Sequence, residues 1–146
     1  MNVVIDTNIA IDLLKPNPDF EENAKAIFRL MGEHHITGHM CANSLTDIFY
    51  VLQKVIGGAG AKQTIMDLIT AVNIIDLTAA DCLKALKLPN PDFEDALVEI
   101  CAEKIKAACI VTRDEKFKQS ATTAKTLTPS ELLTRLTAPP TNSRTI

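Results

Sequence analysis

The stretch that most constrains the fold is residues 3–5, a Val-Val-Ile run near the N-terminus. Three consecutive β-branched residues are typical of a strand that is buried on both faces, as in parallel α/β sheets. Asp6, Thr7 and Asn8 follow directly. Because open parallel sheets bind ligands just beyond the carboxyl ends of their strands, Asp6 is expected at a functional site. Asp6 would also suit a helix cap, but Asn8 stands immediately before an apolar run and competes for that role, which would leave Asp6 free.

The rest of the chain alternates between strand and helix patterns. Further strands are predicted at 36–42, 72–77 and 107–112, with a short edge strand at 125–127, and helices at 9–14, 18–32, 44–56, 61–71, 78–88, 92–105 and 129–136. The glycines of residues 57–60 predict a break or hinge between two of these helices. This alternation favours a three-layer α/β/α fold, with a central parallel sheet of four to five strands and helices on both faces. Residues 1–136 are expected to form one domain, and residues 137–146, which lack a core pattern, a flexible tail.

Composition narrows the class of protein. The 146 residues are 47% hydrophobic and 23% charged, a balance typical of one globular domain. No apolar run approaches the roughly 20 residues that span a bilayer, and no signal-peptide pattern is visible, so a cytoplasmic protein without membrane association is expected. The net charge of −3 gives no argument for nucleic-acid binding. The cysteines lack metal-ligand spacing and are predicted to be buried, reduced thiols: Cys41, Cys82, Cys101 and Cys109.

A second group of acids follows a short sequence that occurs twice, Asn-Pro-Asp-Phe-Glu at 17–21 and at 90–94. Proline and early acids suit the first turn of a helix, so capping can explain Asp92 and Glu94 without any catalytic role. Only the second copy continues with Asp95, an acid that a helix start does not require. Glu99, one helical turn further on, would either support Asp95 or be solvated.

Four segments taken together resemble a PIN domain: VIDTN at 4–8, SLTD at 44–47, DFEDAL at 92–97 and IVTRDEKF at 110–117. The resemblance runs from the first strand to about Leu136 and is most specific in the first and last segments. It is closest in character to the small stand-alone prokaryotic members, including the toxins of VapBC toxin–antitoxin pairs. The resemblance implies a parallel sheet flanked by helices and a metal-dependent endoribonuclease activity.

The resemblance also implies an acidic site. Asp6 matches the acid of the first strand, Asp95 the acid of the later helix, and Asp114 the acid or amide after the fourth strand. The position that usually holds a glutamate has Asp47, which is one methylene shorter. Four residues match small polar positions that orient the acids or contact substrate phosphate: Thr7, Asn8, Ser44 and Thr112. Two further acids would hold the principal acids in place without binding the metal themselves: Asp92 and Glu99.

Crowded carboxylates repel one another, which predicts a bound Mg²⁺ or Mn²⁺, since both ions prefer carboxylate and water oxygens. Contact with RNA would need cations near the acids, and Arg113 and Lys116 flank Asp114. An ordinary solvated surface is the alternative for each cation. The three histidines at 34, 35 and 39 are expected at a polar helix end and not in a metal site.

Two function classes remain open at this stage. The first is a metal-dependent endoribonuclease that hydrolyses RNA phosphodiester bonds, as the toxin of a toxin–antitoxin pair does. The second is a catalytically weak PIN-fold module that acts through RNA or protein contacts, which the aspartate at position 47 and the acidic net charge keep open. An antitoxin partner would be expected to bind near the second and third helices, and a homodimer is a further expectation from relatives.

Overall fold

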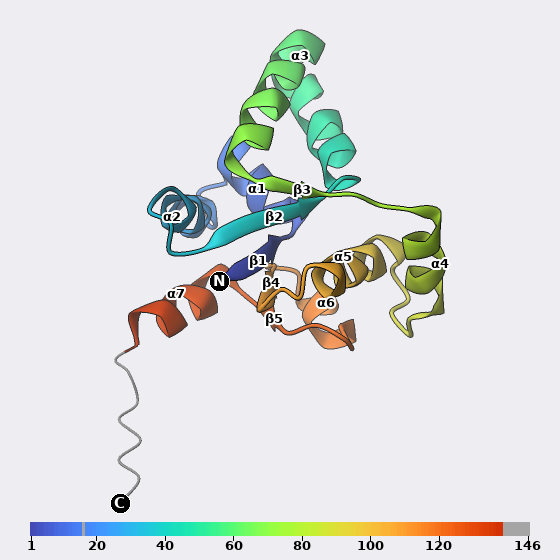
Figure 1. The fold of residues 1–146 in the computed structure, drawn as a ribbon. Helices are drawn as coiled ribbons and strands as arrows, with labels where there is room; N and C mark the ends of the chain where they lie inside the picture. Colours follow the sequence, from blue (N-terminus) through green and yellow to red (C-terminus); the bar gives the residue numbers. More distant parts are fainter. Residues whose placement is uncertain (16, 139–146) are drawn as a thin grey trace, which may run out of the picture.

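The central layer is a five-stranded parallel sheet with the strand order β3-β2-β1-β4-β5 (Figure 1). The computed structural model describes residues 1–15 and 17–138. The strands are β1 (Asn2–Ile5), β2 (Thr37–Cys41), β3 (Asn73–Ile75), β4 (Cys109–Val111) and β5 (Thr126–Leu127). The β-branched run predicted as a buried strand therefore forms the middle strand, and residues 126–127 form an edge strand as predicted.

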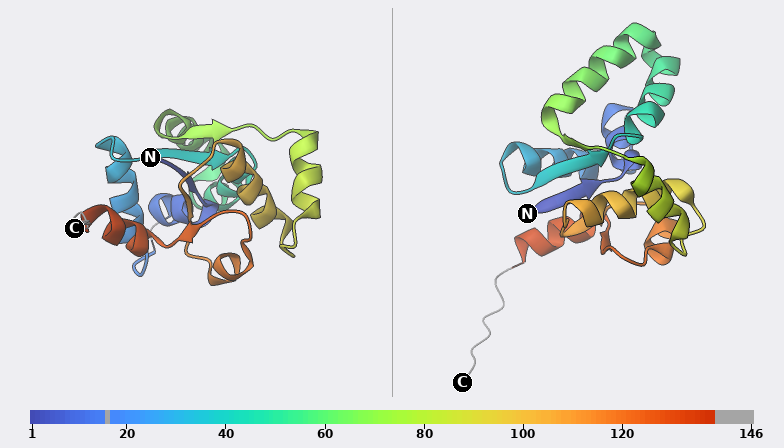
Figure 2. Two further views of the ribbon diagram at one scale, coloured as in Figure 1. Left: turned by 60° about the horizontal axis from the view of Figure 1, so that its bottom comes forward. Right: turned by 45° about the vertical axis from the view of Figure 1, so that its right-hand side comes forward.

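Helices cover both faces of this sheet, which confirms the predicted three-layer architecture (Figure 2). They are α1 (Thr7–Leu14), α2 (Glu21–Gly32), α3 (Ser44–Ala71), α4 (Ala79–Lys87), α5 (Phe93–Lys104), α6 (Glu115–Ser120) and α7 (Pro129–Thr137). Successive β1 side chains point to opposite faces, as strand geometry requires. Val3 and Ile5 pack with residues of α1, α2, α3 and α7, whereas Val4 packs with residues of α5 and α6.

Helix α3 is long and sharply bent. Its 28 residues are interrupted at Gly57, whose φ of 77° and ψ of 168° are not helical. Only glycine adopts such a conformation without steric cost. The predicted break in residues 57–60 is therefore confirmed, and Figure 1 shows the two arms of α3 rising from the sheet and returning to it.

The two Asn-Pro-Asp-Phe-Glu copies begin in the same way and then diverge. In each, the asparagine side chain accepts a hydrogen bond from the aspartate amide two residues on, from Asp19 to Asn17 (3.2 Å) and from Asp92 to Asn90 (3.0 Å). In the second copy Asp92 caps α5, which starts at the next residue. In the first copy the turn continues, and α2 begins only at Glu21, later than the predicted start at residue 18.

The remaining predictions about the chain have mixed outcomes. All four cysteines are free thiols, but Cys82 is only partly buried, unlike the other three. Helix α7 ends at Thr137, one residue beyond the predicted end. The predicted tail lies mostly outside the described residues. Among those that are described, no helix combines the length and apolarity that a membrane crossing requires.

Candidate functional site

Six carboxylates line one pocket of about 270 Å³ at the carboxyl edge of the sheet. They come from four places in the fold: the end of β1, the start of α3, the start of α5, and the turn after β4. They are Asp6, Asp47, Asp92, Glu94, Asp95 and Asp114. The structure thus brings together all four predicted principal acids, Asp6, Asp47, Asp95 and Asp114, although they are far apart in the sequence. We call the pocket that these six carboxylates line the acidic pocket.

Asp6 is anchored by hydrogen bonds on both carboxylate oxygens. Its Oδ1 accepts from the Thr7 amide (2.8 Å), and its Oδ2 accepts from the Thr112 hydroxyl (2.7 Å) and the Asn8 side-chain amide (3.2 Å). Asp6 is therefore the N-cap of α1, and the prediction that Asn8 takes that role is wrong. The helix starts two residues earlier than the apolar run suggests, which leaves Asn8 inside its first turn, where its side chain can turn back to Asp6.

Hydrogen bonds between small polar side chains join the segments that carry the acids. The Thr112 hydroxyl, which donates to Asp6, also accepts from the Asp114 amide (3.1 Å). The Thr7 hydroxyl donates to the Ser44 hydroxyl (2.9 Å), joining α1 to α3. Because these hydroxyl groups are already bonded within the protein, they orient the acids; direct contact of Thr7, Ser44 and Thr112 with phosphate stays a prediction.

Asp114 and Asp92 are also helix caps. Asp114 Oδ1 accepts from the amides of Lys116 (2.9 Å) and Phe117 (3.3 Å) at the start of α6. Asp92 Oδ1 accepts from the Asp95 amide (3.0 Å) at the start of α5. The capping explanation for Asp92 is therefore correct, yet the same residue lines the acidic pocket beside Asp95.

Glu99 is fully buried, so of the two alternatives, support of the acids or a solvated side chain, solvation is excluded. Its Oε1 accepts from the backbone amides of Thr122 (2.7 Å) and Thr123 (3.0 Å), and its Oε2 accepts from the Asn90 side chain (3.3 Å). Asn90 in turn holds the Asp92 amide. Glu99 therefore supports the acids indirectly, by fixing the turn that precedes α5.

Glu94 is a pocket residue that the sequence comparison of the two copies set aside. Its carboxyl group shares a hydrogen bond with Asp47, and this bond, together with burial and the Asp47 charge, raises the pKa of Glu94 to about 7. Glu94 thus lies beside Asp47, the residue that the sequence resemblance matches to a position usually held by glutamate. One sequence feature could have indicated it: Glu94 directly precedes Asp95, the acid that only the second Asn-Pro-Asp-Phe-Glu copy has after it.

The crowded carboxylates of the acidic pocket disfavour one another's ionisation. Burial raises the pKa of Asp95 to about 7, helped by the charges of Asp92, Asp6 and Asp114. The pKa of Asp6 is also raised, chiefly by burial, although its hydrogen bonds from Thr112 and Thr7 oppose the rise. Raised pKa values of this kind mark carboxylates that gain from a nearby positive charge.

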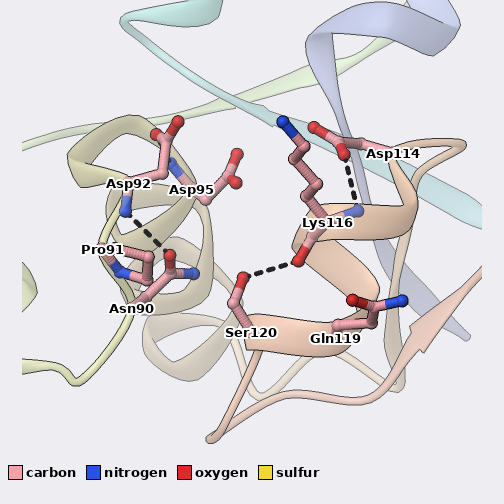
Figure 3. A pocket seen from close by; sticks show the side chains of 8 residues that line it. All are labelled: Asn90, Pro91, Asp92, Asp95, Asp114, Lys116, Gln119 and Ser120. Carbon is pink, nitrogen blue, oxygen red and sulfur yellow. Dashed lines mark hydrogen bonds between the residues drawn. The ribbon is translucent and has the colours of Figure 1, made fainter.

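A larger pocket of about 520 Å³ continues from the acids (Figure 3). Asp92 and Asp95 stand on one side of it, and Lys116, Gln119 and Ser120 of α6 on the other. The Lys116 side chain extends toward the end of the pocket where Asp114 lies. Lys116 thus occupies the position expected of a cation near the acids.

Arg113 has a different placement from Lys116. Its guanidinium forms a two-bond ion pair with Asp12, through Nε–Oδ2 (2.6 Å) and Nη2–Oδ1 (3.0 Å), and lies over the Phe20 ring at 4.1 Å. It lines a pocket other than the acidic one. The prediction that Arg113 contacts RNA is not tested by these contacts, which show it tying the turn after β4 to α1.

The donor set suits a hard divalent cation, because every charged ligand in the pocket is a carboxylate oxygen. Across residues 1–15 and 17–138, however, no three acidic, histidine or cysteine side chains form a ready-made metal shell. The residues therefore fit such an ion in chemistry and in charge, while the shell needs side-chain rotation or water and substrate oxygens to be completed.

An open parallel sheet with carboxylates clustered beyond its strand ends defines an α/β protein with an oxygen-ligand site at its carboxyl edge. A family model described as the PIN domain matches residues 2–116. The chain therefore belongs to the PIN domain family, as the sequence resemblance indicated. No curated protein matches the sequence.

Solved structures share this fold at low sequence identity. The VapBC2 complex of Rickettsia felis, bound to a promoter DNA fragment, has a chain that is 18% identical with a TM-score of 0.68, covering 88% of this chain and 98% of that one. The VapBC-1 structure from nontypeable Haemophilus influenzae is 18% identical with a TM-score of 0.66, covering 89% and 99%. The Mycobacterium tuberculosis toxin VapC20, described as cleaving the sarcin–ricin loop, is 17% identical with a TM-score of 0.63, covering 82% and 95%.

Proposed function

We propose that this protein is a metal-dependent endoribonuclease that hydrolyses RNA phosphodiester bonds. The observation that carries the proposal is the acidic pocket, in which carboxylates from four separate segments meet at the edge where parallel sheets bind ligands. Membership of the PIN domain family supports a nuclease. The similar VapC20 structure is described as that of a toxin that cleaves the sarcin–ricin loop, and on this likeness we take RNA as the substrate class.

Asp6, Asp95 and Asp114 are the proposed metal ligands, with Asp47 completing the set and Glu94 beside it. Mg²⁺ or Mn²⁺ is the proposed cofactor. When bound, the ion would supply a polarised water and would neutralise charge on the phosphoryl oxygens. Since Asp47 is shorter than the usual glutamate, Glu94 is well placed to extend the reach of that corner of the pocket.

The protein's own groups would position the RNA strand. The strand would pass from the acidic pocket into the larger pocket, where the Lys116 ammonium group can pair with a flanking phosphate. Asn8 and Thr112 hold Asp6 in place, and Thr7 and Ser44 keep α1 and α3 together, so the acids stay aligned while phosphate charge enters.

The test is cleavage of a mixed pool of structured and unstructured RNA by the wild type and by Asp6→Asn, with Mg²⁺, Mn²⁺ or EDTA. Asp67→Asn, which changes an exposed carboxylate on α3, is the matched control. Cleavage that requires metal, persists in Asp67→Asn and is lost in a folded Asp6→Asn supports the proposal. Absence of cleavage by folded wild type with either metal would favour the catalytically weak binding module instead.

A toxin role with an antitoxin partner is part of the same proposal. It is supported by the likeness to chains of VapBC complexes and by apolar side chains exposed on the arms of α3, among them Tyr50, Val55 and Met66. A cytoplasmic location and a homodimer are proposed with it. A small open reading frame directly upstream, whose product co-purifies with this chain and inhibits cleavage, is the expected observation.

A further inference from the structure

A separate pocket of about 230 Å³ opens beside Arg113, and no role described so far uses it. It is lined from α1, from the start of α2, from the start of α7 and from the turn after β4. Two of its lining residues are close in sequence to residues that line the acidic pocket. Asp12 is one helical turn beyond Asn8 on α1, and Glu115 directly follows Asp114. Whatever occupies this pocket would therefore be a near neighbour of a strand held at the acidic pocket.

One wall of the pocket is a flat stacking surface. The Phe20 ring covers the Arg113 guanidinium at 4.1 Å, and Asp12 holds that guanidinium in place with two hydrogen bonds. Phe20 is 37% exposed, so part of its side chain remains accessible beside the guanidinium. A planar ligand could add to this stack, because aromatic rings and guanidinium planes are the surfaces on which proteins stack nucleobases.

The rest of the lining combines an apolar floor with a polar rim. Ile9 and Ala24 are buried residues that form part of the floor. Asn23 and Ser130 stand at the rim, where the Asn23 amide donates a long hydrogen bond to the Ser130 hydroxyl (3.5 Å). Such a bond is weak, so both groups can exchange it for a ligand.

Charge and size restrict the ligand. Arg113 is neutralised by Asp12, so the Glu115 carboxylate leaves the lining with a negative charge, and Pro129 gives the start of α7 one amide donor fewer. The pocket is therefore unsuited to a phosphate. Its volume is below the range of about 300–1,000 Å³ typical of pockets for drug-sized ligands, so it suits one small planar group, such as a fused heterocycle.

We propose that this pocket binds one base of the RNA, and that the base carries an amino group next to a ring N–H, as guanine does. The base would stack on Phe20, its two donors would face the Glu115 carboxylate, and Asn23 and Ser130 would bond the remaining edge. The proposal rests on the proposed function only in taking RNA as the ligand. It supplies a means of base selection for a protein that has few aromatic residues.

The experiment uses the absence of tryptophan from the sequence. Phe20→Trp gives a single-tryptophan protein whose indole keeps the stacking surface and is quenched when a base stacks on it. Fluorescence is followed during titration with guanosine 5′-monophosphate, with inosine 5′-monophosphate, which lacks the amino group, and with ribose 5-phosphate, which lacks the base. EDTA is present throughout, so no cleavage occurs. Tyr50→Trp, on the exposed part of α3, is the matched control.

Saturable quenching by guanosine monophosphate is expected in Phe20→Trp and not in Tyr50→Trp. Binding of inosine monophosphate should be about tenfold weaker, because one hydrogen bond to a charged acceptor is lost. Glu115→Gln in the Phe20→Trp background should bring the two affinities together, and ribose 5-phosphate should have no effect. Equal, unsaturable quenching in both tryptophan variants would overturn the proposal. A saturable response to arginine amide without one to nucleotides would assign the pocket to a cationic side chain of a protein partner and would also overturn it.

Saturation-transfer NMR on the unmodified protein provides a second measurement that does not depend on the tryptophan variant folding. Transfer to the guanosine monophosphate H8 proton should persist in Phe20→Tyr and disappear in Phe20→Leu; persistence in a folded Phe20→Leu would contradict stacking. The two proposals also fail separately. RNA cleavage without base binding would remove only this pocket, whereas base binding without cleavage would support the binding module.

Discussion

Removal of Arg113 should destabilise the protein more than removal of Asp12, its partner in the ion pair. The Asp12 side chain is 3% exposed, whereas the Arg113 side chain is 34% exposed. Removing the arginine would leave a carboxylate that water cannot reach, and removing one partner of a buried pair costs about 3–5 kcal/mol. Removing the carboxylate would leave a guanidinium that is already one-third exposed to water, so the cost should lie between that of a surface pair, about 0.2–1 kcal/mol, and that of a buried pair, and we expect about 1–2 kcal/mol.

We therefore expect Arg113→Met to lower the free energy of unfolding by about 3 kcal/mol and Asp12→Asn by about 1–2 kcal/mol. The double variant should be less destabilised than the sum of the two, because it strands neither charge. Urea denaturation at pH 7, followed by far-UV circular dichroism, would measure all four species of this cycle. Arg113→Lys, which keeps the charge but loses the two-bond geometry, should fall between wild type and Arg113→Met.

An equal or larger loss for Asp12→Asn than for Arg113→Met would refute the reasoning, and so would strict additivity in the double variant. The pair has a second consequence for the proposed function. Arg113 lies between Thr112, which is bonded to Asp6, and Asp114, which lines the acidic pocket. A weaker ion pair would let this turn move, so a folded Arg113→Lys variant should cleave RNA more slowly.

Three further predictions concern the acids. The pKa of Asp95 rises from an ordinary 3.8 to about 7, so between these values the folded state holds a proton that the unfolded state releases; the metal-free protein should therefore lose stability as pH rises from 5 to 7.5. Thermal unfolding in EDTA should show this fall, and Mn²⁺ should restore more stability at pH 7.5 than at pH 5. Asp95→Asn should make the fall shallower, and the part that remains comes from Glu94 and Asp6, whose pKa values are also raised. His39, whose pKa is lowered by burial, acts in the opposite direction in both proteins and cancels in the comparison. Glu99→Gln should cost about 2–3 kcal/mol in urea denaturation, since a buried charged acceptor for two backbone amides is lost; an unchanged midpoint would contradict that role. Asp47→Glu should lower the metal concentration that gives half-maximal cleavage, and a higher requirement would show that the shorter side chain is the better fit here.

Residues whose roles depend on local pattern were the ones that sequence could predict. The β-branched run at 3–5 identified the central strand, the alternation of strands and helices identified the layers, and Asp95 stood out because a helix start does not need it. The N-cap of α1 was misassigned because Asp6 and Asn8 are both good caps, and the choice between them depends on Thr112, which is distant in sequence.

Roles that depend on distant partners could not be predicted. Contact of Arg113 with RNA stays a prediction, but its ion pair could not be predicted, because its partner Asp12 lies on the first helix, far away in the sequence. The sequence leaves Glu99 open between supporting Asp95 and being solvated, because nothing near it in sequence indicates that residues 122 and 123 supply backbone donors to it. Glu94 has no catalytic role in the sequence interpretation because the first copy of its motif is a plain helix start, and only the fold brings it into one pocket with Asp47.

Three of the pocket carboxylates, on Asp6, Asp92 and Asp114, each cap the first turn of a different helix. The positive ends of three helix dipoles therefore converge on the pocket and hold its anions in place before any ion arrives. Each capping residue commits carboxylate lone pairs to backbone amides, which leaves fewer for a cation. An ion at this site would keep much of its coordination sphere for water and for phosphate oxygens. Under the proposed function, such a site would suit rapid exchange of ligands during turnover and not permanent storage of a metal.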